Sequence, residues 1–63
     1  MQIEISTANE ITYRGDLGSF LRETSFGYNN FKQHDIENIR NLNVNETHVI
    51  FIEKQHMTVK RIK

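Results

Sequence analysis

The stretch THVIFIEKQHMTVKRI, residues 47–62, predicts a β-hairpin and with it a fold based on a sheet. Residues 47–53 are rich in β-branched and aromatic side chains, which favour strands. Residues 56–62 predict the returning strand, and Lys54-Gln55 between them predicts a two-residue turn. Successive side chains of a strand point to opposite faces, so this turn sets which residues of the two strands lie together.

The turn length decides how the apolar side chains of this hairpin are shared between its faces. A two-residue turn pairs Ile52 with Met57, and one face then carries Ile50, Ile52, Met57 and Val59. The opposite face carries Val49, Phe51, His56, Thr58 and Lys60. A loop of three or five residues reverses the parity, and Val49 and Phe51 then join Met57 and Val59.

In either register the strand over residues 47–53 has large apolar side chains on both faces. Helices can cover only one face of a four-stranded sheet, so the other face needs a further cover. We expect that cover to be a second copy of the chain or a different protein. The alternatives are that Phe51 or Ile50 is a tolerated exposed residue, or that a long loop folds over it.

A second hairpin is predicted at the start of the chain. Apolar and polar residues alternate in residues 1–6 and again in residues 10–14, which is the pattern of a half-buried strand. Gly15 is expected to end the second of these strands. A three-residue loop between the strands would put their apolar side chains on one face, with Ile5 opposite Ile11 and Ile3 opposite Tyr13.

Two short helices are predicted between the hairpins. Asp16 can cap the first helix by accepting from the backbone N–H groups of Gly18 or Ser19. The apolar stripe of this helix is Leu17, Phe20 and Leu21, and Gly27 is its expected stop.

The second helix has two candidate starts. Asn30 and Gln33 have the spacing of a capping box, and a later start with Asp35 as the cap is the alternative. The helix is expected to end near Asn43. Its apolar stripe is Ile36, Ile39 and Leu42.

These elements predict a single α+β domain over residues 1–63, in the order ββααββ. We expect a four-stranded antiparallel sheet with two short helices packed on one face. The first and third strands are expected in the interior of the sheet, because their apolar content is highest. A chain of 63 residues buries only about 60% of its unfolded surface, so a partner subunit would add to a narrow margin of stability.

The composition favours a cytoplasmic protein. The chain has no cysteine, which excludes disulfides and thiolate metal sites and suits a reducing compartment. The longest apolar run, residues 49–52, is far shorter than the roughly 20 residues that cross a bilayer. Isoleucine and asparagine are frequent, as in AT-rich genomes, so we expect a bacterial or phage origin.

The sequence contains no motif of a catalytic or metal site. The histidines His34, His48 and His56 lack the spacing of zinc ligands, and the two-residue register keeps the last two apart. Carboxylates occur singly, and no serine has the setting of a nucleophile. We therefore expect no metal, no cofactor, no small-molecule substrate and no enzymatic activity.

The last ten residues of the chain hold four basic residues and no acidic residue: Lys54, Lys60, Arg61 and Lys63. They could contact phosphates, with Phe51 or His56 stacked on a base. The chain as a whole has a net charge of zero, however, and lysines also protect sheet edges from aggregation. A solvated surface is therefore the alternative to a nucleic-acid site.

Residues 26–31 hold three aromatic side chains. We expect Phe26 and Phe31 to pack at the end of the core. Tyr28, between Gly27 and Asn29, is expected to be exposed and available to a partner.

The leading hypothesis is a small non-catalytic protein-interaction module, either a homodimer or a regulator or inhibitor of another protein. Its interaction residues would be Val49, Phe51, Tyr28, His56 and Thr58. The alternative is a nucleic-acid-binding module that uses the basic C-terminal hairpin, and a weaker one is an oligomeric enzyme with a shared site. We expect the second hairpin to carry the function and the first to serve as scaffold.

Overall fold

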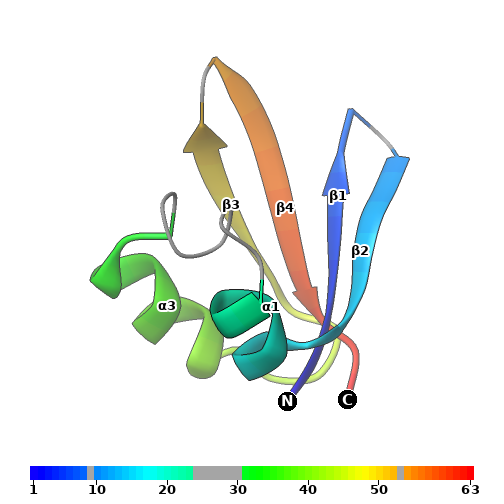
Figure 1. Cartoon of the computed structure of the whole chain (residues 1–63), viewed down its shortest axis with the longest axis vertical. Helices are drawn as coiled ribbons and strands as arrows, with labels where there is room; N and C mark the ends of the chain where they lie inside the picture. Colours follow the sequence, from blue (N-terminus) through cyan, green and yellow to red (C-terminus); the bar gives the residue numbers. More distant parts are fainter. Residues whose placement is uncertain (9, 24–30, 53) are drawn as a thin grey trace.

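The computed structural model of the chain describes residues 1–8, 10–23, 31–52 and 54–63. Its elements follow the predicted order ββααββ (Figure 1). The four strands form one antiparallel sheet, which confirms the α+β fold. The elements are β1 (Gln2–Thr7), β2 (Glu10–Asp16), α1 (Leu17–Glu23), α3 (Gln33–Arg40), β3 (Thr47–Ile52) and β4 (Gln55–Arg61).

The strands lie side by side in the order β2-β1-β4-β3. The prediction that the first strand is interior is confirmed, whereas the prediction that the third strand is interior was wrong, because β3 lies at an edge and β4 takes the second central place. Apolar content did not reveal this, since half of the apolar side chains of β3 face away from the core. The central pair is formed by the two ends of the chain, which lie together in Figure 1 and are joined by a bond from the Gln2 amide to the Lys63 carbonyl.

The core lies between the sheet and the two helices, which pack on the same side of the sheet (Figure 1). Ile3, Ile5 and Val59 of the central strands are almost fully buried there, together with Ile39 of α3. The remaining core residues are Leu17, Phe20, Phe31, Ile50 and Met57. The apolar stripes predicted for both helices and the core position of Phe31 are thus confirmed, while Phe26 lies outside the described residues.

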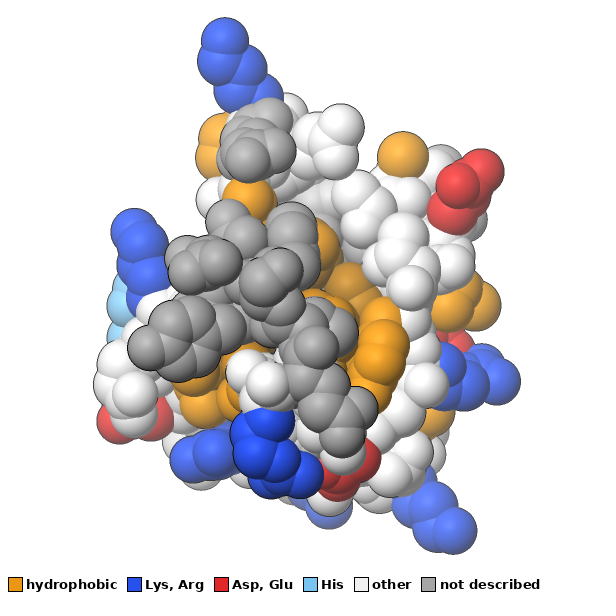
Figure 2. All heavy atoms as spheres, in the orientation of Figure 1, with side chains coloured by type: hydrophobic (Ala, Val, Ile, Leu, Met, Phe, Trp, Pro, Cys, Tyr) orange, Lys and Arg blue, Asp and Glu red, His pale blue; other side chains and the backbone are white. Residues whose placement is uncertain are grey.

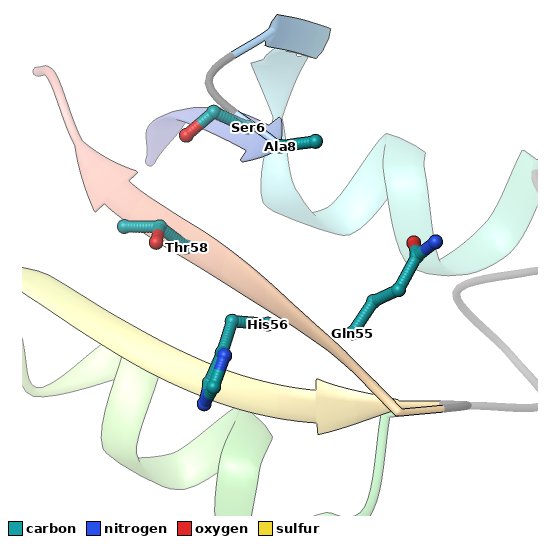
Figure 3. Close-up of a pocket in the computed structure, with 5 residues that line it drawn as sticks. All are labelled: Ser6, Ala8, Gln55, His56 and Thr58. Carbon is teal, nitrogen blue, oxygen red and sulfur yellow. The ribbon is translucent and has the colours of Figure 1, made fainter.

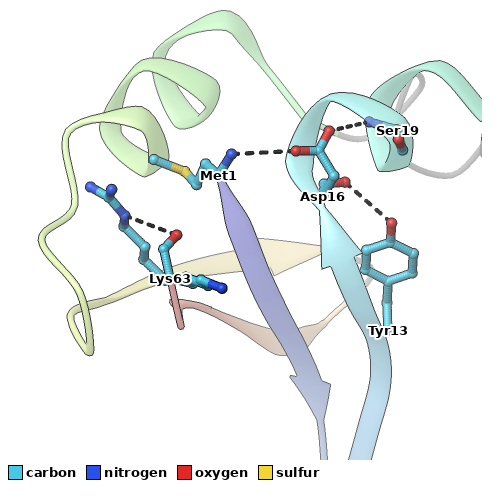
Figure 4. A network of polar contacts seen from close by, with 6 residues as sticks. Met1, Tyr13, Asp16, Ser19 and Lys63 are labelled. Atoms are coloured by element: carbon cyan, nitrogen blue, oxygen red, sulfur yellow. Dashed lines mark hydrogen bonds and ion pairs between the residues drawn. The ribbon is translucent and has the colours of Figure 1, made fainter.

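Helix α1 begins where the sequence predicted it. The carboxylate of Asp16 accepts a bond from the Ser19 backbone amide at 3.0 Å and lies 3.3 Å from the amino group of Met1 (Figure 4). The strand before it does not end at Gly15, as predicted, but continues to Asp16, and Gly15 pairs with Ile3. The ring of Tyr13 lies over Gly15, so close that a Cβ there would approach the Tyr13 hydroxyl to 2.7 Å.

The N-terminal hairpin has a different register from the predicted one. Thr7 pairs with Glu10, which leaves a two-residue turn, and Thr12 is an extra residue in β2 that forms a bulge opposite Ile5. The two-residue turn places Ile11 opposite Ser6, and the bulge then brings Tyr13 instead of Thr12 opposite Ile5. Ile11 consequently lies on the face of the sheet that is turned away from the helices.

The C-terminal hairpin keeps the predicted parity with a shifted turn. Ile52 pairs with Gln55 instead of Met57, so the two-residue turn is formed one position earlier than expected. Lys54 adopts a left-handed backbone conformation there, with a φ of 66°. When a two-residue turn moves by one position, each side chain stays on the same face of the hairpin. The predicted division of the apolar side chains between the two faces is therefore correct.

Helix α3 starts without the predicted caps. Lys32 occupies the N-cap position with an extended backbone and makes no capping bond through its side chain. Asn30 lies outside the described residues, and Asp35 lies inside the first turn as a buried residue. The helix ends at Arg40, three residues before the predicted end. Among the described residues, no helix is long and apolar enough to cross a membrane.

Candidate functional site on the open face of the sheet

The face of the sheet opposite the two helices, here called the open face, carries the exposed apolar side chains of the strands. Alternation along each strand produces it, because residues that flank the buried core positions point the other way. Val49 and Phe51 of β3 are 52% and 63% exposed, and Ile11 of β2 is 59% exposed. Large apolar side chains therefore stand in water along both edges of this face.

Three rows of side chains cross the open face at right angles to the strands. The middle row has small polar residues at its centre and an aliphatic residue at each end: Ile11, Ser6, Thr58 and Val49. The row towards the chain termini is charged except for its last member: Arg14, Glu4, Lys60 and Thr47. In the row towards the hairpin turns, Phe51 pairs with His56, and their rings lie 4.9 Å apart.

The charged row contains an ion pair within the N-terminal hairpin. Arg14 Nε donates to Glu4 Oε2 at 3.1 Å. Glu4 is the more buried partner, with 18% of its side chain exposed against 64% for Arg14. Lys60 is the neighbour of Glu4 on the other central strand. The centre of this row therefore places one acidic and one basic residue side by side.

A shallow hollow of about 340 Å³ lies between the two hairpins, where β1 and β4 separate towards their turns (Figure 3). Its lining combines hydroxyl, imidazole and amide groups around one methyl group: Ser6, Thr58, His56, Gln55 and Ala8. Such groups can exchange hydrogen bonds with a bound surface, and the neighbouring Phe51 supplies apolar area. The open face is thus suited to recognition.

The structure brings four of the five predicted interaction residues together. Val49 pairs with Thr58, and Phe51 pairs with His56, so these four side chains form one continuous part of the open face. The fifth, Tyr28, lies outside the described residues. Sequence reasoning did not include Ile11, because the bulge at Thr12 that turns it outward leaves no clear signal in the sequence.

The four basic residues of the predicted nucleic-acid site do not lie together. Lys54 is in the turn at one end of β4, and Lys63 follows the other end. Lys60 lies on the open face, whereas Arg61 points to the helix side and donates to the Leu42 carbonyl at 2.8 Å. On the side of the molecule shown in Figure 2, Lys and Arg side chains are distributed around the outline and do not form one continuous patch.

A polar contact between α3 and β3 was not foreseen. Asp35 is 9% exposed, and its Oδ1 lies 3.1 Å from Nε2 of His48 and 3.4 Å from Nε2 of His34. His48 shares the parity of Ile50 and therefore faces the helix, which is the signal that could have indicated this contact.

This cluster does not extend to a metal site. Within the described ranges, no group of three or more His, Cys, Asp or Glu side chains is arranged to hold a metal ion. Two imidazoles that share one carboxylate oxygen instead connect the helix to the edge strand. His56 pairs with Phe51, and it lies on the other face of the sheet from His48.

The chain was compared with family models, with curated proteins and with solved structures, and no match was found in any of the three.

Proposed function

We propose that the chain is a small non-catalytic interaction module that binds a protein surface through the open face. The exposed aliphatic and aromatic side chains of Ile11, Val49 and Phe51 are the observation that carries this proposal. Val49 and Phe51 are neighbours on one face of β3, and exposed apolar side chains that lie together in this way often mark an interaction site. The partner is a second copy of the chain or another protein that the module regulates or inhibits.

The arrangement of the patch also supports binding over catalysis. Its apolar groups stand at the edges of the sheet, and small hydroxyl side chains occupy the centre, so the surface is broad and shallow. An interface gains affinity from aromatic and aliphatic anchors surrounded by polar groups. We place this activity in the reducing cytoplasm, which suits a chain without cysteine.

The nucleic-acid alternative has less support. Its four basic residues are separated by the length of β4 and by the two faces of the sheet, and the net charge of the chain is zero. A strand of nucleic acid needs a continuous basic track. Only Lys60 of that group contributes to the open face.

The proposal predicts that a charge at Phe51 abolishes binding without unfolding the chain. An immobilised wild-type chain should retain a partner from the cells in which it is expressed naturally, or a second copy of itself, and Phe51→Glu should lose it. Arg40→Glu, on the exposed side of α3, is the matched control and should retain the partner. Equal retention by Phe51→Glu and wild type would show that the open face is not the binding surface.

A further inference from the structure

The open face is complementary to itself. Its middle row has Ile11 at one end, on β2, and Val49 at the other end, on β3, and both belong to the same cross-strand ladder. The centre of this row, between Ser6 and Thr58, lies between the two central strands. A half-turn about an axis that runs parallel to the strands at this centre places β3 of one copy over β2 of another at the same height.

The charged row has the same property. Glu4 of β1 and Lys60 of β4 are direct neighbours on either side of the same centre line. The half-turn that stacks Val49 on Ile11 also places Glu4 of one copy over Lys60 of the other, twice. Charges of opposite sign then alternate both within each sheet and between the two sheets, which is the arrangement of lowest electrostatic energy for four charges.

We propose that a second copy of this chain covers the open face, related by a two-fold axis that runs parallel to the strands between β1 and β4. This inference rests on the proposed function and names its partner. The sheets pack face to face with their strands aligned, and the small Ser6 and Thr58 side chains allow the close approach that such packing needs. Each Phe51 lies towards the turn of the partner's N-terminal hairpin.

The size of the face determines how strong this association is. The molecule measures 27 × 24 × 19 Å along its principal axes. One such face can bury at most about 600 Å² per copy, which is at the lower end for specific interfaces. We therefore expect a reversible dimer in the micromolar range, in which every matched pair contributes measurably.

The test uses variants that disfavour the dimer alone and attract each other when mixed. Val49→Glu places a carboxylate over the apolar Ile11 of the other copy, and Ile11→Lys places an ammonium group over the apolar Val49 of the other copy. Each variant alone should associate at least about tenfold more weakly than wild type, which is a loss of about 1.4 kcal/mol. In the mixed dimer Glu and Lys face each other, and the remaining Ile11 faces the remaining Val49, so mixing should restore association.

Light scattering after size exclusion at about 100 μM measures the mass of each species, and native mass spectrometry identifies the mixed dimer.

A second pair, Glu4→Lys and Lys60→Glu, tests the charged row in the same way. Circular dichroism checks that each variant is folded, and the Val49 and Ile11 pair decides the test if Glu4→Lys unfolds through loss of its Arg14 contact. Glu37→Lys and Arg40→Glu, on exposed positions of α3, are the matched controls and should associate like wild type.

A wild-type chain that is monomeric at about 100 μM would overturn the inference, and so would folded variants whose mixture stays monomeric. These outcomes differ from a failure of the proposed function. If the chain is monomeric but Phe51→Glu loses a different captured protein, the open face is still a binding surface and only the identity of its partner is wrong. If the chain dimerises and charges at Val49 and Phe51 change nothing, the open face itself is excluded.

Discussion

At the scale of single residues, Asp16 connects three parts of the chain. It ends β2, caps α1 through the Ser19 amide, and forms an ion pair with the amino group of Met1 at 3.3 Å (Figure 4). The Ser19 backbone N–H and then the Met1 ammonium group hold the pKa of Asp16 below its usual value. The charged form of this carboxylate is therefore favoured by folding.

This lowered pKa gives a prediction for the pH dependence of stability. Asp16 has a lower pKa in the folded chain than in the unfolded one, so its contribution is complete above the unfolded value of about 4 and is lost as pH falls through the folded value. We expect Asp16→Asn to have a lower Tm than wild type at pH 7. The gap should narrow as pH is lowered below about 4. Thermal melts between pH 7 and pH 2 measure it, and a gap that stays constant would contradict the prediction.

At the scale of elements, successive side chains of β3 point alternately into the core and onto the open face. Ile50 is 5% exposed in the core, and its neighbour Phe51 is exposed on the open face. Ile50→Glu puts a charge into the core and should unfold the chain, because burying an unpaired charge costs several kcal/mol. Phe51→Glu should change the free energy of unfolding of the monomer by less than about 0.5 kcal/mol. Urea denaturation of both variants at low concentration gives the comparison, and the reverse order would mean that the faces of β3 are exchanged.

The sequence predicted the elements of the fold better than their arrangement. The type and order of the six elements in the described ranges were correct, because alternation and helical spacing are local properties of the sequence. The predicted assignment of side chains to the two faces of the C-terminal hairpin was also correct, because a shift of its two-residue turn by one position leaves the parity unchanged. The N-terminal register was wrong because its turn has two residues instead of three, and because the bulge at Thr12 is not marked by a distinctive side chain.

The arrangement of the strands depends on contacts between distant residues, which local patterns do not contain. The high apolar content of β3 indicated an interior strand, yet Val49 and Phe51 are exposed at the sheet edge. The same apolar content did predict an exposed apolar face, because the helices can cover only one face of the sheet and β3 has large apolar side chains on both. The outward position of Ile11 became visible only with the turn and the bulge of the N-terminal hairpin, whereas the parity of His48 could have indicated its contact with Asp35.

At the scale of the whole molecule, association and folding should be linked. Copies that bind only when folded stabilise one another by mass action, and at a concentration ten times the Kd this amounts to about 1.4 kcal/mol. In a domain of this size such a change raises the Tm by several degrees, about 4–8 °C per kcal/mol. We expect the Tm of the wild-type chain to rise with concentration between about 5 and 200 μM, and the Tm of Phe51→Glu to stay constant. A concentration-independent wild-type Tm would speak against self-association.

The central pairing of β1 with β4 also has a kinetic consequence. Ile3 lies opposite Arg61, so the middle of the sheet joins the segments that are farthest apart along the chain. Each hairpin can close early, because its strands are separated by only a short turn, but neither alone has a covered face. Loop-closure entropy must be overcome before the distant contacts form, and topologies dominated by such contacts fold slowly for their size. On the ribosome, the sheet cannot assemble until the chain has been synthesised through β4. Until then the apolar side chains of β1 lack the strand against which they pack in the folded chain.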